Sequence, residues 1–144
     1  MLARALLWVV TLMNKYFIAW LVVVVAMVAM DVLWLGFLAK SWYQEGIGHL
    51  MAEKPKVLAA LAFYVIYAVG LVVFTVAPRA GMEGWHSTAL MAALFGLVAY
   101  ATYDLSNLAT LRNWPLWLSL LDMAWGSAAS AVAATAGKLV VDRV

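Results

Sequence analysis

Residues 16–39 read YFIAWLVVVVAMVAMDVLWLGFLA, and this stretch decides the fold class. It carries a single charged side chain, Asp31, and exceeds the roughly 20 residues that a membrane-spanning helix needs. Three more apolar stretches follow at about residues 57–78, 84–108 and 116–137. Because lipid offers the backbone no hydrogen-bond partner, each stretch is expected to be helical. The sequence therefore predicts an all-α protein, an integral membrane four-helix bundle.

The composition supports a membrane protein and excludes several other classes. Of 144 residues, 68% are hydrophobic and 11% are charged, whereas soluble domains have about a quarter charged residues. The net charge of +2 is too small to indicate a nucleic-acid partner. The chain has no cysteine, which excludes disulfides and thiolate metal sites. The partner that this composition predicts is the lipid bilayer.

We expect a single membrane domain over residues 15–144, preceded by an interfacial or disordered extension at residues 1–14. Met13 also fits a native start, which leaves open whether residues 1–12 belong to the native protein. Four spans place both termini on one side of the membrane. That side carries five basic residues and the other side four, so the positive-inside rule favours cytoplasmic termini.

Small residues recur at four-residue spacing in the last span, a pattern that lets helices approach closely. They include Gly126 with Ser130, and Ala133 with Gly137. Packing within the bundle explains this pattern more simply than dimerisation does, although a homo-oligomer stays open.

Three carboxylates, Asp31, Asp104 and Asp122, lie inside the expected spans. The alternating topology brings the end of span one, the start of span two, the end of span three and the start of span four to one side. With a rise of 1.5 Å per residue, the three carboxylates lie roughly 6–12 Å inside that side. A carboxylate in lipid is costly, so we expect these groups to face the bundle interior or a wet cavity.

Helical spacing places aromatic and amide side chains on the same helix faces as these carboxylates. If the faces converge, the bundle holds a carboxylate–aromatic pocket, with Arg112 and His49 at its mouth. As an alternative, Asp104 and Asn107 equally fit the frayed interfacial end of span three. The predicted pocket residues are Asp31, Trp34, Tyr64, Tyr67, Tyr100, Tyr103, Asp104, Asn107, Asp122 and Trp125.

Three carboxylates close together in a low dielectric cannot all remain ionised. We therefore expect a proton, a cation or Arg112 to neutralise them. Oxygen ligands suit a hard cation such as Mg²⁺ or Ca²⁺. No cofactor motif is recognisable, because H-E-x-x-H, G-x-S-x-G and Gly-rich phosphate loops are all missing. A hard cation or a bound lipid remains as a candidate ligand.

Four blocks of the sequence resemble a known family. They are DVLWLGFLAKSWYQEGIGHL (31–50), FYVIYAVGLVVF (63–74), GLVAYATYDLSNLATLRNWP (96–115) and DMAWGSAASA (122–131). Together they are similar to the bacterial membrane family catalogued as domain of unknown function 2177. The family pattern usually has Thr where this chain has Ser106, which keeps the hydroxyl.

The resemblance implies a small four-helix protein of the bacterial inner membrane, and it implies no activity. The positions of this chain that match the family pattern are Asp31, Trp34, Gly36, Tyr64, Tyr67, Tyr103, Asp104, Asn107, Asp122, Trp125 and Gly126.

The sequence leaves three functions open. In the first, the pocket binds or transports a cation, a proton or a small amphiphilic ligand, with Asn107 as an oxygen ligand. In the second, the protein is a lipid-modifying enzyme in which an aspartate is the general acid or base and Tyr103 is a donor. In the third, it is a structural or partner-binding subunit that uses the small-residue face of span four.

Overall fold

The computed structural model describes the backbone of residues 2–144 and their side chains except those of residues 2–10 and 12. This described part contains helices and turns but no strand. Its long helices are α1 (Leu2–Leu33), α3 (Val57–Leu71), α4 (His86–Thr110) and α5 (Leu116–Val141). Within the described chain, four helical stretches are long and apolar enough to cross a membrane. The predicted fold class, an all-α membrane four-helix bundle, is therefore confirmed.

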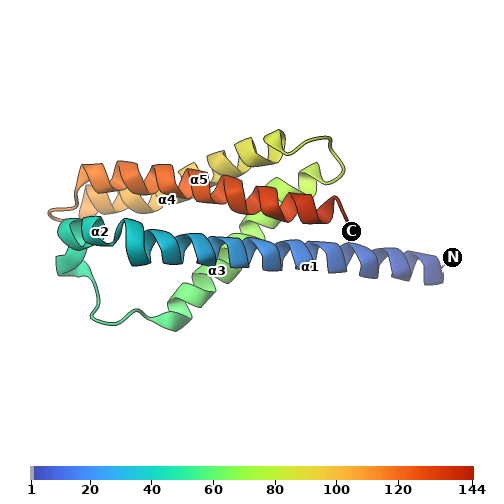
Figure 1. The fold of residues 1–144 in the computed structure, drawn as a ribbon, viewed down its shortest axis with the longest axis horizontal. Coiled ribbons are helices and arrows are strands. Elements are labelled where there is room, and N and C mark those ends of the chain that lie inside the picture. Colours follow the sequence, from blue (N-terminus) through green and yellow to red (C-terminus); the bar gives the residue numbers. More distant parts are fainter. Residues whose placement is uncertain (1) are drawn as a thin grey trace.

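The helices alternate in direction, so that both chain ends lie at the same end of the bundle (Figure 1). α4 and α5 lie side by side, and α1 packs along α5. α3 contacts α1 but crosses the bundle obliquely, and its N-terminal end stands away from α4 and α5 (Figure 1). The bundle is therefore closed along α1, α4 and α5 and open beside the first half of α3.

Two helices end in a turn of π-helix. In η1 (Trp34–Leu38), the N–H of Ala39 donates to the carbonyl of Trp34 at 2.7 Å, five residues back. The second such turn, η3 (Val72–Val76), extends α3 and is followed by the 3₁₀ turn η4 (Ala77–Arg79). A π turn inserts an extra residue and so rotates the side chains around it relative to an α-helix.

α2 (Lys40–Ile47) is a short helix that follows η1 and contacts α5. A 3₁₀ turn, η2 (Gly48–Leu50), then leads to the α2–α3 connection. A Cβ at Gly46 would lie 3.1–3.3 Å from side chains at the start of α5. This small residue therefore allows α2 to pack closely against the end of the bundle.

The spans run over Met13–Leu38, Val57–Arg79, His86–Thr110 and Leu116–Val141, within four residues of the expected bounds. The residues expected to form an interfacial or disordered extension have a helical backbone from Leu2 that continues into the first span. Most of their side chains lie outside the described residues, so an interfacial placement stays a prediction.

The bundle interior combines an apolar core, in which Met27 and Leu71 are fully buried, with many small and polar residues, and other large apolar residues face outward. α4 buries Thr88, Ala92, Gly96 and Asp104, which recur at multiples of four residues. α5 buries the four small residues Gly126, Ser130, Ala133 and Gly137 within the chain. Such faces bring helices together in lipid, where association relies on close packing rather than on exclusion of water. The outward residues include Val25, Leu58, Ile66 and Leu90.

The closest helix contact joins α4 and α5 at two glycines. A Cβ at Gly96 would lie 2.2 Å from the carbonyl oxygen of Gly126. A Cβ at Gly126 would lie 2.2 Å from the ring of Tyr100. Neither position has room for a side chain, and the backbone of Gly126 cannot move aside as a flexible side chain could.

We expect Gly96→Ala to destabilise the protein by about 1–3 kcal/mol, the usual range for overpacking, because it forces α4 and α5 apart. Gly36→Ala is the matched control, since a Cβ there meets nothing within 4 Å. Thermal unfolding of the detergent-solubilised variants measures the difference. Equal melting temperatures for the two variants would show that the glycine contact does not hold the helices.

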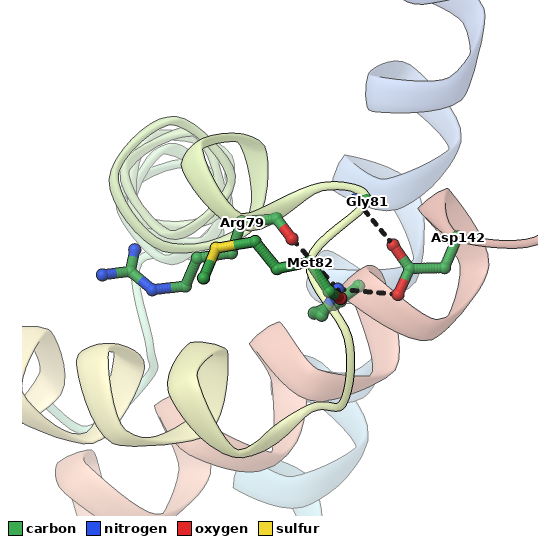
Figure 2. Close-up of polar contacts among 5 residues, drawn as sticks. Arg79, Gly81, Met82 and Asp142 are labelled. Atoms are coloured by element: carbon green, nitrogen blue, oxygen red, sulfur yellow. Dashed lines mark hydrogen bonds and ion pairs between the residues drawn. The ribbon is translucent and has the colours of Figure 1, made fainter.

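A buried lysine ties the connection between η4 and α4 to the end of α5. The side chain of Lys138 is 1% exposed, and its Nζ donates to the carbonyls of Arg79 and Met82 at 3.0 Å. Nζ also lies 2.7 Å from a carboxylate oxygen of Asp142, whose other oxygen accepts from the N–H of Gly81 at 3.3 Å (Figure 2). These contacts satisfy the charge of Lys138, which is why this residue can be buried within α5. The helix continues to Val141, four residues beyond its expected end.

We expect Lys138→Met to lower the thermal stability of the protein and to expose this connection to protease. The substitution keeps the length of the side chain but leaves two carbonyls and one carboxylate without their donor, at a cost of about 1–3 kcal/mol. Arg143→Met, at an exposed neighbouring position, is the control. Protease resistance equal to that of the wild type would contradict the assignment.

The contact between Lys138 and Asp142 makes the stability of the protein depend on pH. The hydrogen bond from Lys138 lowers the pKa of Asp142. Its contribution to stability is therefore full at neutral pH and is lost as the pH falls below about 3.9 and through the lowered pKa. The stability difference between wild type and Asp142→Asn should shrink over that acid range.

Candidate functional site

A cavity of about 560 Å³ lies between the long helices at the end of the bundle next to α2. α1, α3, α4 and α5 contribute its walls, and α2 contributes Tyr43. Asp31 lies seven residues before the end of its candidate span and Asp122 six residues after the start of its candidate span, so both lie toward the same end of the bundle. The lining residues are Asp31, Leu35, Tyr43, Ala60, Phe63, Tyr64, Tyr67, Ala99, Tyr100, Tyr103, Asp122 and Trp125.

Asp31 receives hydrogen bonds from two other helices. The hydroxyl of Tyr64 donates to one carboxylate oxygen at 3.0 Å, and the indole N–H of Trp125 donates to the other at 3.0 Å. The carboxyl group is 6% exposed. Both donors are neutral, so Asp31 is held in place without a positive partner among these contacts.

Asp122 is bound by a tyrosine from outside the spans. The hydroxyl of Tyr43 donates to a carboxylate oxygen of Asp122 in a short hydrogen bond. The same hydroxyl accepts from the indole N–H of Trp34 at 3.4 Å. Burial and the bond to Asp122 raise the pKa of Tyr43 far above its usual range, so the hydroxyl keeps its proton and remains a donor.

The walls between the carboxylates are aromatic. Tyr67 packs edge-to-face against Tyr100, with ring centroids 6.2 Å apart, and its hydroxyl lies 2.8 Å from that of Ser130. The indole rings of Trp34 and Trp125 stack with centroids 4.3 Å apart and an angle of 4° between planes. This stack supports Trp125 from behind and keeps its N–H directed at Asp31.

Asp104 lies behind the cavity, in the contact between α4 and α5. It is 0% exposed, and no hydrogen-bond partner among the described residues reaches either of its carboxylate oxygens. Ser119 and Asp122 are neighbouring polar side chains. Nearby, the indole N–H of Trp114 donates to Ser119 at 2.9 Å and closes this end of the interface. Burial of a carboxyl group without a hydrogen-bond partner is costly.

The structure brings most of the predicted pocket residues to one cavity and excludes the others. Trp34, Asp104 and Asn107 do not line it, because Trp34 lies behind Trp125 and Asp104 faces α5. Arg112 and His49, expected at the mouth, are exposed and do not line it either. The predicted residues that do line it are Asp31, Tyr64, Tyr67, Tyr100, Tyr103, Asp122 and Trp125.

The sequence analysis did not include Tyr43 among the pocket residues, because it lies outside the four apolar stretches. Its role depends on α2 packing back onto α5, which periodicity within the spans does not reveal. Phe63 also lines the cavity and was missed. Phe63 lies directly before Tyr64 in the chain. This adjacency does little to predict a place in the cavity, because neighbouring helical residues point about 100° apart.

The cavity is suited to binding a positive charge. Two carboxylates open on a space walled by seven aromatic side chains beside small apolar side chains, and none of the described lining residues is basic. Aromatic faces and carboxylates both attract cations. Among the described residues, no group of three His, Cys, Asp or Glu side chains is placed to hold a metal ion. The described residues therefore do not bring together three such ligands for the hard cation that the sequence led us to expect.

Comparisons with known proteins place the chain in a family. No curated protein and no solved structure matches it. The family described as "Predicted membrane protein (DUF2177)" matches residues 16–139, which include all four candidate spans apart from the start of the first and the end of the last. The chain is therefore a member of the DUF2177 family of membrane proteins.

Proposed function

We propose that this membrane protein binds an organic cation, such as a protonated or quaternary amine, in the cavity between its spans. The observation that carries the proposal is the pairing of Asp31 and Asp122 with an aromatic wall that contains no basic side chain among the described lining residues. This combination resembles the aromatic cages that recognise quaternary ammonium groups.

The electrostatics of the site support a cationic ligand. Asp31 and Asp122 accept hydrogen bonds from neutral hydroxyl and indole groups, which orient the carboxylates but do not cancel their charge. An ionised carboxylate at membrane depth is stabilised when a positive group lies against it. A proton can supply the same neutralisation, so an organic cation and protons are expected to compete for the site. Such competition is the basis on which binding could be coupled to transport.

An organic cation explains the lining better than the other hypotheses do. A metal ion would use oxygen ligands but would gain little from the tyrosine and tryptophan faces. The small-residue face of α5, which a partner subunit could have used, is buried against the other helices of the chain. A lipid-modifying enzyme could use Asp31 or Asp122 as its general acid or base and Tyr103 as a donor, but the described lining residues include no Ser, Cys, Lys or His to act as a nucleophile.

We expect the protein to bind choline and to lose at least about tenfold in affinity in the Asp31→Asn variant. The substitution keeps the shape of the side chain but removes a negative charge, and the attraction between two unit charges about 4 Å apart near a protein surface is about 4 kcal/mol, more than a tenfold loss requires. Isothermal titration calorimetry in nanodiscs measures the affinity. Glu53→Gln, in the exposed α2–α3 connection, is the charge-matched control.

The neutral analogue 3,3-dimethyl-1-butanol, in which carbon replaces the quaternary nitrogen, separates charge from shape. Much weaker binding of this alcohol than of choline supports the proposal. Equal binding of the two compounds, or unchanged choline affinity in a folded Asp31→Asn variant, would overturn it.

We also propose a bacterial inner-membrane location with both termini in the cytoplasm. The support is the slight excess of basic residues on the side of the termini and the resemblance of the sequence to a bacterial family. In that orientation, α2 and the carboxylate-bearing end of the bundle face the periplasm.

Because the chain contains no cysteine, single cysteines can report this topology directly. We expect Glu53→Cys to react with a membrane-impermeant maleimide in cells whose outer membrane has been permeabilised and whose inner membrane is still sealed. Val144→Cys should react only after the inner membrane is also permeabilised. The reverse pattern of labelling would establish the opposite orientation.

A further inference from the structure

We propose that the ligand is a cationic amphiphile: its ammonium group occupies the acidic cavity and its single alkyl chain lies in an adjoining groove along α4. This inference deepens the proposed function, on which it rests, by naming the class of ligand and the direction from which it enters. It depends on a second hollow that the proposed function does not use.

That second hollow is an apolar groove of about 300 Å³ between η3 and α4. Ala99 lines both the groove and the cavity, so the two hollows adjoin at this residue. The α4 members of the groove fall at the i, i+3, i+4, i+7 and i+8 positions of one helix face, over about 12 Å. Its lining residues are Phe74, Thr75, Met91, Leu94, Phe95, Val98 and Ala99.

The cavity opens sideways toward lipid. Every residue of α3 from Val57 to Phe63 is exposed, and this half of the helix stands away from α4 (Figure 1). Phe63 on one side and Tyr103 on the other are 40% and 54% exposed, although both line the cavity. Tyr103 lies seven residues before the end of its span, about 10 Å below the membrane surface. A ligand that passes this opening therefore comes from the bilayer.

The charges around the two hollows select among amphiphiles. None of the described residues that line the cavity or the groove is Lys, Arg or His. The phosphate of a phospholipid headgroup would face Asp31 and Asp122 without a positive partner. An amphiphile whose only charge is positive avoids this repulsion. The shape and charge of the site thus favour a long-chain amine over a phospholipid.

Three probes test the proposal in nanodiscs: choline, dodecyltrimethylammonium and dodecylphosphocholine. The test variant Leu94→Trp adds bulk to the groove at a half-exposed position. Leu90→Trp makes the same change on α4 at a lipid-facing residue outside the groove lining. Val98→Trp is a second groove variant if Leu94→Trp does not fold.

We expect Leu94→Trp to weaken dodecyltrimethylammonium binding at least tenfold, while choline affinity stays within twofold of wild type. Leu90→Trp should leave both affinities unchanged. Dodecylphosphocholine should bind more weakly than dodecyltrimethylammonium to the wild type.

The outcomes distinguish this inference from the proposed function. If choline binds but both groove variants leave dodecyltrimethylammonium binding intact, the groove assignment is wrong and the proposed function stands. If dodecylphosphocholine binds as tightly as the cation, the selection against phosphate is wrong. Absence of choline binding to the wild type would overturn the proposed function itself.

Discussion

The contact between α4 and α5 at Gly96 and Gly126 is the constraint on which the rest of the structure depends. Without any Cβ at these positions, the two backbones meet directly. Lipid supplies no hydrophobic force to press helices together, so close packing of this kind has to do so. The same contact seats the ring of Tyr100 against Gly126 and thereby fixes one wall of the cavity. Bundle stability and cavity shape thus share a single contact.

The sequence alone was sufficient to predict the four apolar helices and the end of the bundle toward which the carboxylates lie. Both follow from strong local signals: runs of apolar residues long enough to cross lipid, and the fixed rise of a helix. The exclusion of Asp104 from the cavity lining, although it lies next to Asp122, could not be obtained in this way. All three carboxylates lie toward one end of the bundle, but their burial depends on how the helices are rotated and spaced. A rotation of one residue position, about 100°, moves a side chain from the cavity to an interface.

The parts that sequence reasoning missed lie where local patterns carry little information. Tyr43 reaches the site because α2 packs against α5 beside Gly46, a tertiary contact between segments far apart in the chain. Arg112 and His49 were expected at the mouth because they lie in loops on the correct side. Loop residues have no periodicity to fix their direction, and both side chains are exposed.

The hydrogen bonds of Lys138 have a consequence for how α3 can move. They fasten the connection after η4 to the end of α5, and η3 packs against α4 and α5 just before it. The opposite end of α3 has only exposed residues and a long connection to α2. The C-terminal end of α3 is therefore anchored through this connection, whereas the residues at its N-terminal end, Val57–Phe63, are exposed. Any swing of α3 about its anchored end changes the width of the cavity most at the level of Asp31 and Tyr64.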